Sequence, residues 1–454
     1  MRQLQQLINI WKKLTSGSLS RKIFGAATTV ALLTAMVKFV SVFKELFIAW
    51  RFGTGDDLEA FLIALLVPAF IINVIANSFN SALVPTYIQV REQEGIKAAQ
   101  KLFSGATIWS AGILVLTIAI VLSTAPLYLP LIASGFSSQK LSLTFSLLCI
   151  TAPIILLSGI ASTWAAVLNA GERFALAAVV PVTTHVVGIG FLLVFPSWGI
   201  YALAGSLLCG AGIEMVVIGA ALNRQGISLR PRWYGFDTYL KQVAGQYIPM
   251  IVAAFIICSA GVVDQSMAAI LLPGSVASLN YGNRLIASPI SLMSIALSTV
   301  LVPYFSKMVA NKDWSNLHRT LRQSIGVILI VTVPMTIFFI IFSEPIVHIL
   351  FERGKFTTQD THLVSEIQSL YALQIPFYTI NILAIRLITS MQLNHLLIWF
   401  FGCSLLINIG LDYLFMQWIG IKGIALSTSC VYLFSSFSLL WFAERKIKNN
   451  LLYK

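Results

Sequence analysis

The sequence predicts an all-α polytopic membrane protein, with about twelve transmembrane helices divided between two lobes of about six. Of its 454 residues, 57% are hydrophobic and only 10% are charged, whereas a soluble domain carries about 25% charged residues. A globule of this size leaves too much surface facing water to hide so many apolar side chains. The apolar residues also gather in long runs, and motifs of the first half recur in the second. These observations exclude an ordinary soluble enzyme and a disordered chain.

Polar turns separate the apolar runs and place the helix ends to within a few residues. The expected helices span residues 23–50, 58–88, 102–123, 141–168, 174–195, 199–222, 239–271, 276–306, 321–343, 363–391, 396–418 and 421–442. Several exceed the roughly 20 residues that cross a bilayer, so they must tilt, bend or project into water. Prolines in or near these helices are expected to bend them, namely Pro68, Pro85, Pro153, Pro249, Pro303 and Pro376.

The segments between these helices differ in charge. With the N-terminus in the cytoplasm, 21 of the 30 Lys and Arg residues fall in cytoplasmic segments and five in outside segments. Cytoplasmic loops are enriched in Lys and Arg, so both termini are expected in the cytoplasm. This enrichment also explains most of the net charge of +13. We expect no secretory signal, because the first helix is too long and lacks a small-residue cleavage site.

Short motifs recur in order between the two halves. Leu83-Val84-Pro85 matches Leu301-Val302-Pro303, and three further pairs follow at offsets of 219 to 223 residues: Pro126 with Pro345, Pro153 with Pro376, and Ala202-Leu203 with Ala425-Leu426. With an even number of helices in each half, the two halves point the same way, so the repeat is parallel, with a site between the lobes. The expected organisation is a cytoplasmic segment 1–22, an N-lobe 23–222, a cytoplasmic linker 223–238, a C-lobe 239–442 and a cytoplasmic tail 443–454.

Four basic residues lie within the predicted spans: Lys38, Lys44, Arg284 and Arg386. An ionised side chain at the bilayer centre costs about 2.5–3.5 kcal/mol, so it usually faces a wet cavity or a partner. Lys38 is near mid-span, whereas Arg386 is close enough to the inner interface to snorkel. Glu45, near the helical face of Lys38, offers local pairing as the plainer alternative. Because Arg binds phosphate bidentately and Lys acts as a point charge, the cluster suits a diphosphate.

Acidic residues within the spans are fewer. Glu214 and Asp264 flank the junction between the lobes and are candidates for coupling to a proton or cation; local pairing or a helix-end position is the alternative. The five cysteines are odd in number and form no CxxC pair, so we expect no disulfide and no metal. Phosphate-loop, HExxH and GxSxG motifs are also missing from the sequence, which predicts no cofactor and no enzymatic activity.

Three motifs are similar to those of a known family. The segment from Lys38 to Gly95 holds a basic residue, a basic-acidic pair, FG-x-G, an acidic residue before Ala-Phe, and a Val-Pro that closes the second helix: Lys38, Lys44-Glu45, Phe52-Gly53, Gly55, Glu59 and Val84-Pro85. The others are YGNRL at 281–285 and FERGKFT at 351–357. Over about residues 20 to 440, the chain resembles the MurJ/MviN family of lipid II flippases, within the superfamily of multidrug, oligosaccharidyl-lipid and polysaccharide exporters.

The resemblance implies a flippase in the bacterial cytoplasmic membrane. Its cargo would be an undecaprenyl-diphosphate-linked sugar, either lipid II or an exopolysaccharide or O-antigen unit, carried to the outer leaflet by alternating access. The implied substrate-binding residues are Lys38, Lys44, Arg284, Glu45, Glu59, Asn283 and Arg386. Implied partners are the lipid-linked sugar diphosphate, membrane lipids, a coupling cation and cell-wall or polysaccharide biosynthesis proteins, but no nucleic acid. We expect a shorter form, without the two further C-terminal helices of the lipid II flippases.

Two other function classes remain open. The first is a cation-coupled exporter of drugs or small molecules from the same superfamily, which would favour buried acids over buried bases. The second is a membrane scaffold, which needs no buried cations, or a glycosyltransferase, which needs accessible carboxylates. The buried basic residues Lys38, Lys44 and Arg284 favour the flippase.

Overall fold

The computed structural model describes residues 19–171 and 174–452, and within these ranges the chain is helical and contains no strand. The first half forms α2 (Leu19–Phe52), α3 (Asp56–Ile71), the π-helical turn η1 (Ile72–Ala76), α4 (Asn77–Glu94), α5 (Ile96–Ile132), α6 (Ser138–Thr151), α7 (Pro153–Ala170), α8 (Phe174–Val179), α9 (Val182–Val194), the short turn η2 (Pro196–Trp198) and α10 (Ile200–Arg224). The second half forms α11 (Thr238–Ile270), α12 (Ser275–Ala310), α13 (Trp314–Ile341), α14 (Ser343–Phe351), α15 (Thr358–Ala372), α16 (Gln374–Ser390), α17 (Asn394–Ile419) and α18 (Ile421–Leu452). The predicted all-α membrane architecture is therefore confirmed.

The helices are long enough to serve as membrane spans. Ten helical segments of the described chain have the length and apolar composition to cross a bilayer. Each of the twelve predicted ranges overlaps one helix or one run of consecutive helices, including α2 and α12. That α2 and α12 also cross the membrane stays a prediction, as does the count of twelve. Several helices extend further than predicted; α5, for example, continues from the predicted 102–123 to Ile96–Ile132.

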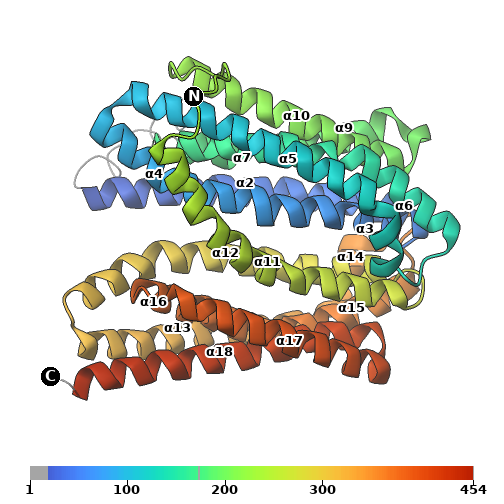
Figure 1. The fold of residues 1–454 in the computed structure, drawn as a ribbon. Coiled ribbons are helices and arrows are strands. Elements are labelled where there is room, and N and C mark those ends of the chain that lie inside the picture. Colours follow the sequence, from blue (N-terminus) through green and yellow to red (C-terminus); the bar gives the residue numbers. More distant parts are fainter. Residues whose placement is uncertain (1–18, 172–173, 453–454) are drawn as a thin grey trace, which may run out of the picture.

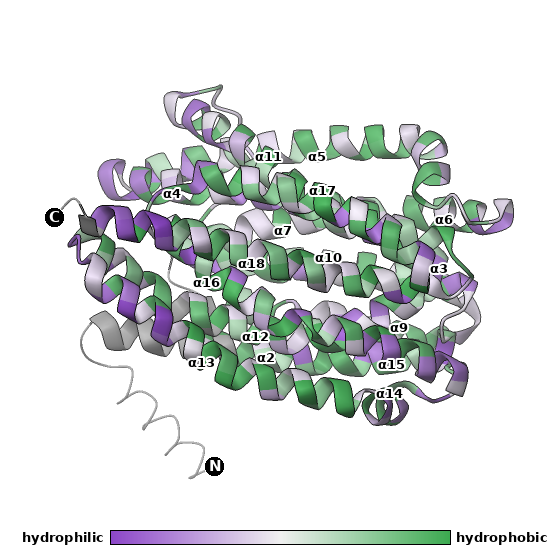
Figure 2. Cartoon of the chain, turned by 90° about the horizontal axis from the view of Figure 1, so that it is seen from below, coloured by the Kyte–Doolittle hydropathy of each residue, from purple (hydrophilic) through white to green (hydrophobic). Residues whose placement is uncertain are grey.

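The surface matches a bilayer environment. Figure 2 shows hydrophobic residues along the middle of the helices and hydrophilic residues gathered toward their two ends. Large apolar side chains stay exposed in the middle of several helices, among them Leu116 on α5, Ile330 on α13 and Leu406 on α17. An exposed apolar surface of this extent marks contact with lipid rather than water.

Prolines interrupt corresponding helices in the two halves. The fourth predicted helix breaks between α6 and α7, where Pro153 begins the second piece. The tenth breaks between α15 and α16, and Pro376 lies in the first turn of α16. Pro68, Pro85, Pro249 and Pro303 instead lie inside continuous helices. The matched breaks are what a parallel repeat predicts, although the repeat itself stays a prediction.

The helices form two groups joined by α11. In Figure 1 the helices from α2 to α10 lie on one side and those from α12 to α18 on the other, while α11 runs obliquely between them. α11 packs against α4 and α5 of the first group and α17 of the second. One hydrophobic cluster joins the groups, because Tyr281 and Phe351 pack with Ile48 and Phe61. The boundary between the predicted lobes stays a prediction, and most of the N-terminal segment 1–22 lies outside the described residues.

Candidate functional site

Two of the predicted basic residues meet at the contact between the two groups of helices. Arg284 on α12 reaches across to Glu45 on α2, with Nη2 3.2 Å from Oε1. The Arg284 side chain is 50% exposed and Glu45 is 14% exposed, so the guanidinium remains accessible while paired. Together with Lys44 these residues line a small cavity of about 60 Å³. We call Lys44, Glu45 and Arg284 the interlobe site.

Lys44 is buried without an ion pair. Its exposed fraction is 8%, and no described carboxylate lies within 4.0 Å of its ammonium group. The aliphatic stem packs on Gly188 of α9, where an added Cβ would lie 3.0 Å from Lys44 Cδ. A buried charge of this kind is costly unless a partner arrives. The interlobe site therefore contains more positive than negative charge.

A second, larger cavity holds three more of the predicted residues. It measures about 820 Å³ and is lined by Lys38 from α2, Asn283 from α12 and Arg386 from α16. Lys38 and Asn283 are exposed to this space. Arg386 donates a hydrogen bond from Nε to Ser298 Oγ over 3.0 Å. We call this space the main cavity, and its size lies within the range of small-molecule binding sites.

Glu59 occupies a different place. It is 1% exposed and pairs with Lys140 of α6, whose Nζ lies 2.5 Å from Oε2 and 2.6 Å from Asp56 Oδ1. Its other oxygen accepts a hydrogen bond from the backbone N–H of Val276, at the start of α12, over 2.6 Å. We call Asp56, Glu59, Lys140 and the Val276 N–H the outer clamp. Glu59 lines neither cavity just described, so this geometry gives it a structural position.

The two acids predicted for ion coupling have unlike surroundings. Glu214 on α10 is half-buried, and its carboxylate accepts a hydrogen bond from Thr184 Oγ1 at 3.4 Å. Asp264 on α11 lines the main cavity and accepts from Asn408 Nδ2 at 3.2 Å and Thr428 Oγ1 at 3.5 Å. Asp264 thus belongs to a polar cluster, whereas Glu214 stands apart from it.

Sequence reasoning missed most of the cluster around Asp264. Asp412 is fully buried, and its carboxyl group contacts Asp264 and the Ser427 hydroxyl. Neither of its oxygens makes a hydrogen bond of good geometry with the described residues. The Oδ1 atom of Asn408 also lacks a partner. The spacing of Asn408 and Asp412 places them on one face of α17, a signal that the sequence contains. With a second carboxyl group beside Asp264, the pair holds a shared proton or a cation more favourably than two full negative charges.

A loop closes the contact between the two groups of helices at the end where α2 stops. The backbone N–H of Lys355 donates to the Trp50 carbonyl over 2.9 Å, and Thr54 Oγ1 donates to Asp360 Oδ1 over 2.5 Å. Gly354 has a φ of +62° and packs so closely on Trp50 that a Cβ would overlap it. The FERGKFT motif therefore forms a backbone contact that leaves no room for a side chain.

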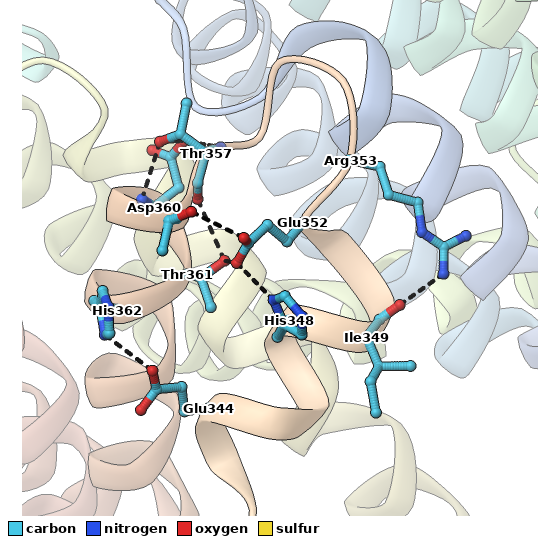
Figure 3. Close-up of polar contacts among 10 residues, drawn as sticks. Glu344, His348, Ile349, Glu352, Arg353, Thr357, Asp360, Thr361 and His362 are labelled. Carbon is cyan, nitrogen blue, oxygen red and sulfur yellow. Dashed lines mark hydrogen bonds and ion pairs between the residues drawn. The ribbon is translucent and has the colours of Figure 1, made fainter.

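The same loop is held by a carboxylate. Figure 3 shows Glu352 between His348 and Thr361, with dashed contacts to both. His348 Nδ1 lies 2.8 Å away, Thr361 Oγ1 2.6 Å and Thr358 Oγ1 2.9 Å. These bonds, that from His348 first, lower the pKa of Glu352 to about 2. A carboxylate that is kept charged by several donors orders a loop.

Comparisons with known proteins agree with these features. A family model described as lipid II flippase MurJ matches residues 48–453. A protein from Synechocystis named probable lipid II flippase MurJ is 27% identical, over 95% of this chain and 83% of its own length. One from Thermotoga maritima with the same name is 27% identical, over 88% and 81%. The lipid II flippase MurJ from Burkholderia cenocepacia is 25% identical, over 89% and 80%.

Solved structures share the fold. A structure titled lipid II flippase MurJ, inward closed conformation, matches with a TM-score of 0.81 and 24% identity, covering 93% of this chain and 90% of that one. An inward-facing multidrug resistance MATE family transporter of the MOP superfamily matches with a TM-score of 0.73 and 11% identity, covering 92% and 98%. At these identities the structures establish the fold and leave the cargo to be argued from the site.

Proposed function

This chain belongs to the MurJ family, and from that premise we propose that it moves lipid II from the inner to the outer leaflet of the bacterial cytoplasmic membrane. The curated relatives are named for this cargo. A diphosphate with attached sugars cannot cross hydrocarbon unaided, because burying its charge and polar groups without partners is too costly. The protein supplies a polar route between its two groups of helices and opens it to each side in turn.

The observation that carries this proposal is the unbalanced positive charge of the interlobe site. Among the described residues, buried Lys44 has no ion pair, and Arg284 pairs only with Glu45. An anion that enters between the groups of helices would relieve the cost of the buried ammonium. A diphosphate carries more charge than one carboxylate and accepts both Arg N–H groups, so it displaces Glu45 from Arg284. Glu45 thereby holds Arg284 ready while no cargo is bound.

The other predicted residues take supporting parts. Lys38, Asn283 and Arg386 line the main cavity, where they receive the cargo before it reaches the interlobe site. Glu59 acts through the outer clamp, by joining α3 and α6 to the start of α12. The clamp and the FERGKFT loop lie at the ends of helices predicted to face outside, so this conformation is closed to the outer side. Both termini lie in the cytoplasm.

The acids of the second half provide a place for a coupling cation. Asp264 and Asp412 lie side by side, and neither is paired with a basic residue among the described residues. Two adjacent carboxylates in a low-dielectric setting bind a proton or a metal cation in preference to both standing charged. Asp264 also faces the main cavity, so binding of the cation and binding of the cargo affect one another. Glu214 lacks such a neighbour and is the weaker candidate.

The alternative is a cation-coupled exporter of drugs or small molecules. The MATE transporters share the fold, and the Asp264–Asp412 pair fits cation coupling. Such an exporter for cationic drugs gains nothing from unpaired buried Lys44, which would repel its cargo. The charge of the interlobe site therefore favours an anionic, lipid-linked cargo.

The test is depletion of the protein in its host, followed by identification of the lipid-linked sugar that accumulates on the cytoplasmic leaflet. We expect lipid II, and restoration of its export by the wild-type protein. Arg284→Ala should insert normally and fail to restore export, because its guanidinium is the bidentate phosphate donor. Accumulation of an exopolysaccharide or O-antigen unit would show that this unit, and not lipid II, is the cargo. Full export by Arg284→Ala would show that Arg284 does not bind the diphosphate.

A further inference from the structure

One wall of the main cavity is polar but uncharged. It is formed by five residues of α16 and α18: Gln374, Tyr378, Asn381, Tyr432 and Ser435. On α16 the three residues are spaced by four and three positions, so they lie on one helical face and extend over roughly 10 Å. We call these five residues the neutral wall. The charged groups of the cavity lie beyond it, with Arg386 toward one end of α16 and Asp264 on the neighbouring α11.

Contacts between its own residues hold the neutral wall in place. Asn381 Nδ2 donates to Ser435 Oγ over 2.6 Å and thereby ties α16 to α18. The rings of Tyr378 and Tyr432 meet edge to face, with centroids 4.8 Å apart. These contacts fix the orientation of the amide and of both rings before any ligand arrives, which lowers the entropic cost of binding.

Several polar atoms of the wall have no partner in the protein. Within the described part of the chain, the Gln374 amide and the Tyr378 and Tyr432 hydroxyls make no hydrogen bond. Polar groups at membrane depth are costly unless they face water or a ligand. All three residues line the main cavity, so a ligand there that donates and accepts hydrogen bonds can pair with them.

From this arrangement we infer that the neutral wall is the subsite for the sugar part of the cargo, an N-acetylated hexosamine unit. A sugar presents hydroxyl and acetamido groups that both donate and accept, as amides and phenols do. Its C–H faces pack on aromatic rings, which Tyr supplies together with a polar handle. The subsite carries no charge of its own, whereas the diphosphate binds the cations of the interlobe site. This inference rests on the proposed function, because it places the sugar of that cargo in the main cavity and its diphosphate in the interlobe site.

The test compares two probes on the purified protein in lipid nanodiscs. Lipid II is used after an amidase has removed its peptide, so that it differs from undecaprenyl diphosphate by its sugars alone. For Tyr378→Leu and for Asn381→Leu we expect lipid II binding to weaken about tenfold, as one or two lost hydrogen bonds and a ring contact predict. Binding of undecaprenyl diphosphate should stay within about twofold of wild type, which also shows that the variant is folded. Arg284→Ala should weaken both probes.

Two matched variants complete the design. Tyr413 on α17 is 58% exposed and lines neither cavity, so Tyr413→Leu makes the same chemical change on the outside and should leave both probes unchanged. Tyr378→Phe keeps the ring and should lose less lipid II affinity than Tyr378→Leu. Should one wall variant fail to fold, the other gives the answer.

The outcomes separate the two proposals. Equal weakening of both probes by the wall variants, or no weakening of lipid II, would overturn the sugar subsite while leaving the proposed function in place. Failure of the wild-type protein to bind either probe would reject the proposed function and the subsite with it. Weakening of lipid II alone supports both.

Discussion

Lys44 and Lys140 are buried to the same extent, with 8% of each side chain exposed, but their surroundings are opposite. Lys140 in the outer clamp has two carboxylate oxygens within 2.6 Å. Lys44 in the interlobe site has none within ion-pairing distance among the described residues. A buried charge that is fully paired holds a structure together, whereas one left unpaired is a cost that a ligand can remove. The comparison separates the structural charges of this protein from those that bind cargo.

The largest effect is expected at the paired lysine. Lys140→Met leaves the carboxylate of Glu59 buried without its counter-ion, which costs about 3–5 kcal/mol of folding stability. Thermal unfolding in lipid nanodiscs measures this loss as a lower midpoint. Lys140→Met combined with Glu59→Gln should regain much of it, because a neutral amide oxygen still accepts from Val276. An unchanged midpoint for Lys140→Met would show that the clamp does not stabilise the fold.

The matched substitution at the unpaired lysine, Lys44→Met, should reduce transport without reducing folding stability. Lys44→Met removes a buried charge that lacks a partner, so the unfolding midpoint should stay the same or rise. Transport of lipid II should fall by about a hundredfold, equivalent to about 2.7 kcal/mol, because a charge-assisted contact to phosphate is lost. Flipping in reconstituted vesicles measures the rate. A lower midpoint with intact transport would reverse the assignment of the two lysines.

Lys38 adds a third lysine to the comparison, one that is exposed to the main cavity. In this cavity charge matters more than shape, so Lys38→Arg should transport better than Lys38→Ala. We expect the alanine variant to lose about tenfold, or about 1.4 kcal/mol, since water already solvates the site. The same flipping assay compares the two. Equal loss from both variants would mean that Lys38 acts by its shape.

The smallest effect is expected from pH at the FERGKFT loop. Donors from His348, Thr361 and Thr358 lower the pKa of Glu352 from 4.5 to about 2. Because the folded-state pKa is depressed, the stabilisation is present above pH 4.5 and is lost as the pH falls toward 2. The protection of the amides of residues 352–358 against hydrogen exchange, measured relative to the intrinsic rate at each pH, should therefore fall in that range. Glu352→Gln should remove the pH dependence, and a dependence that persists in this variant would point to another group.

The sequence predicted the helical membrane fold well, because runs of apolar residues and the spacing of prolines are local signals. It also indicated Lys44, Glu45 and Arg284 as candidate binding residues, because charged residues are rare within apolar runs. It missed Lys140, because a basic residue near a helix start looks like an ordinary loop charge. Only tertiary contact reveals that Lys140 is buried against Glu59.

The remaining parts of the site depend on pairings between distant helices. Asp412 is recognised as part of a candidate cation site only through its contact with Asp264, which lies far away in the sequence on α11. The neutral wall has no charge to mark it, and its Asn381–Ser435 bond joins helices 54 residues apart. Substrate binding by Glu59 stays a prediction, and the sequence did not reveal its bonds to Lys140 and Val276. Periodicity places a residue on a face but does not name what that face meets.

The most direct test of the account is a structure of the protein bound to lipid II. The account predicts that the diphosphate lies within about 3 Å of the Arg284 guanidinium and of a lysine ammonium, Lys44 or Lys38, with Glu45 released from Arg284. A complex in which the diphosphate lies elsewhere, while Arg284 keeps its bond to Glu45 and Lys44 stays without a partner, would contradict it.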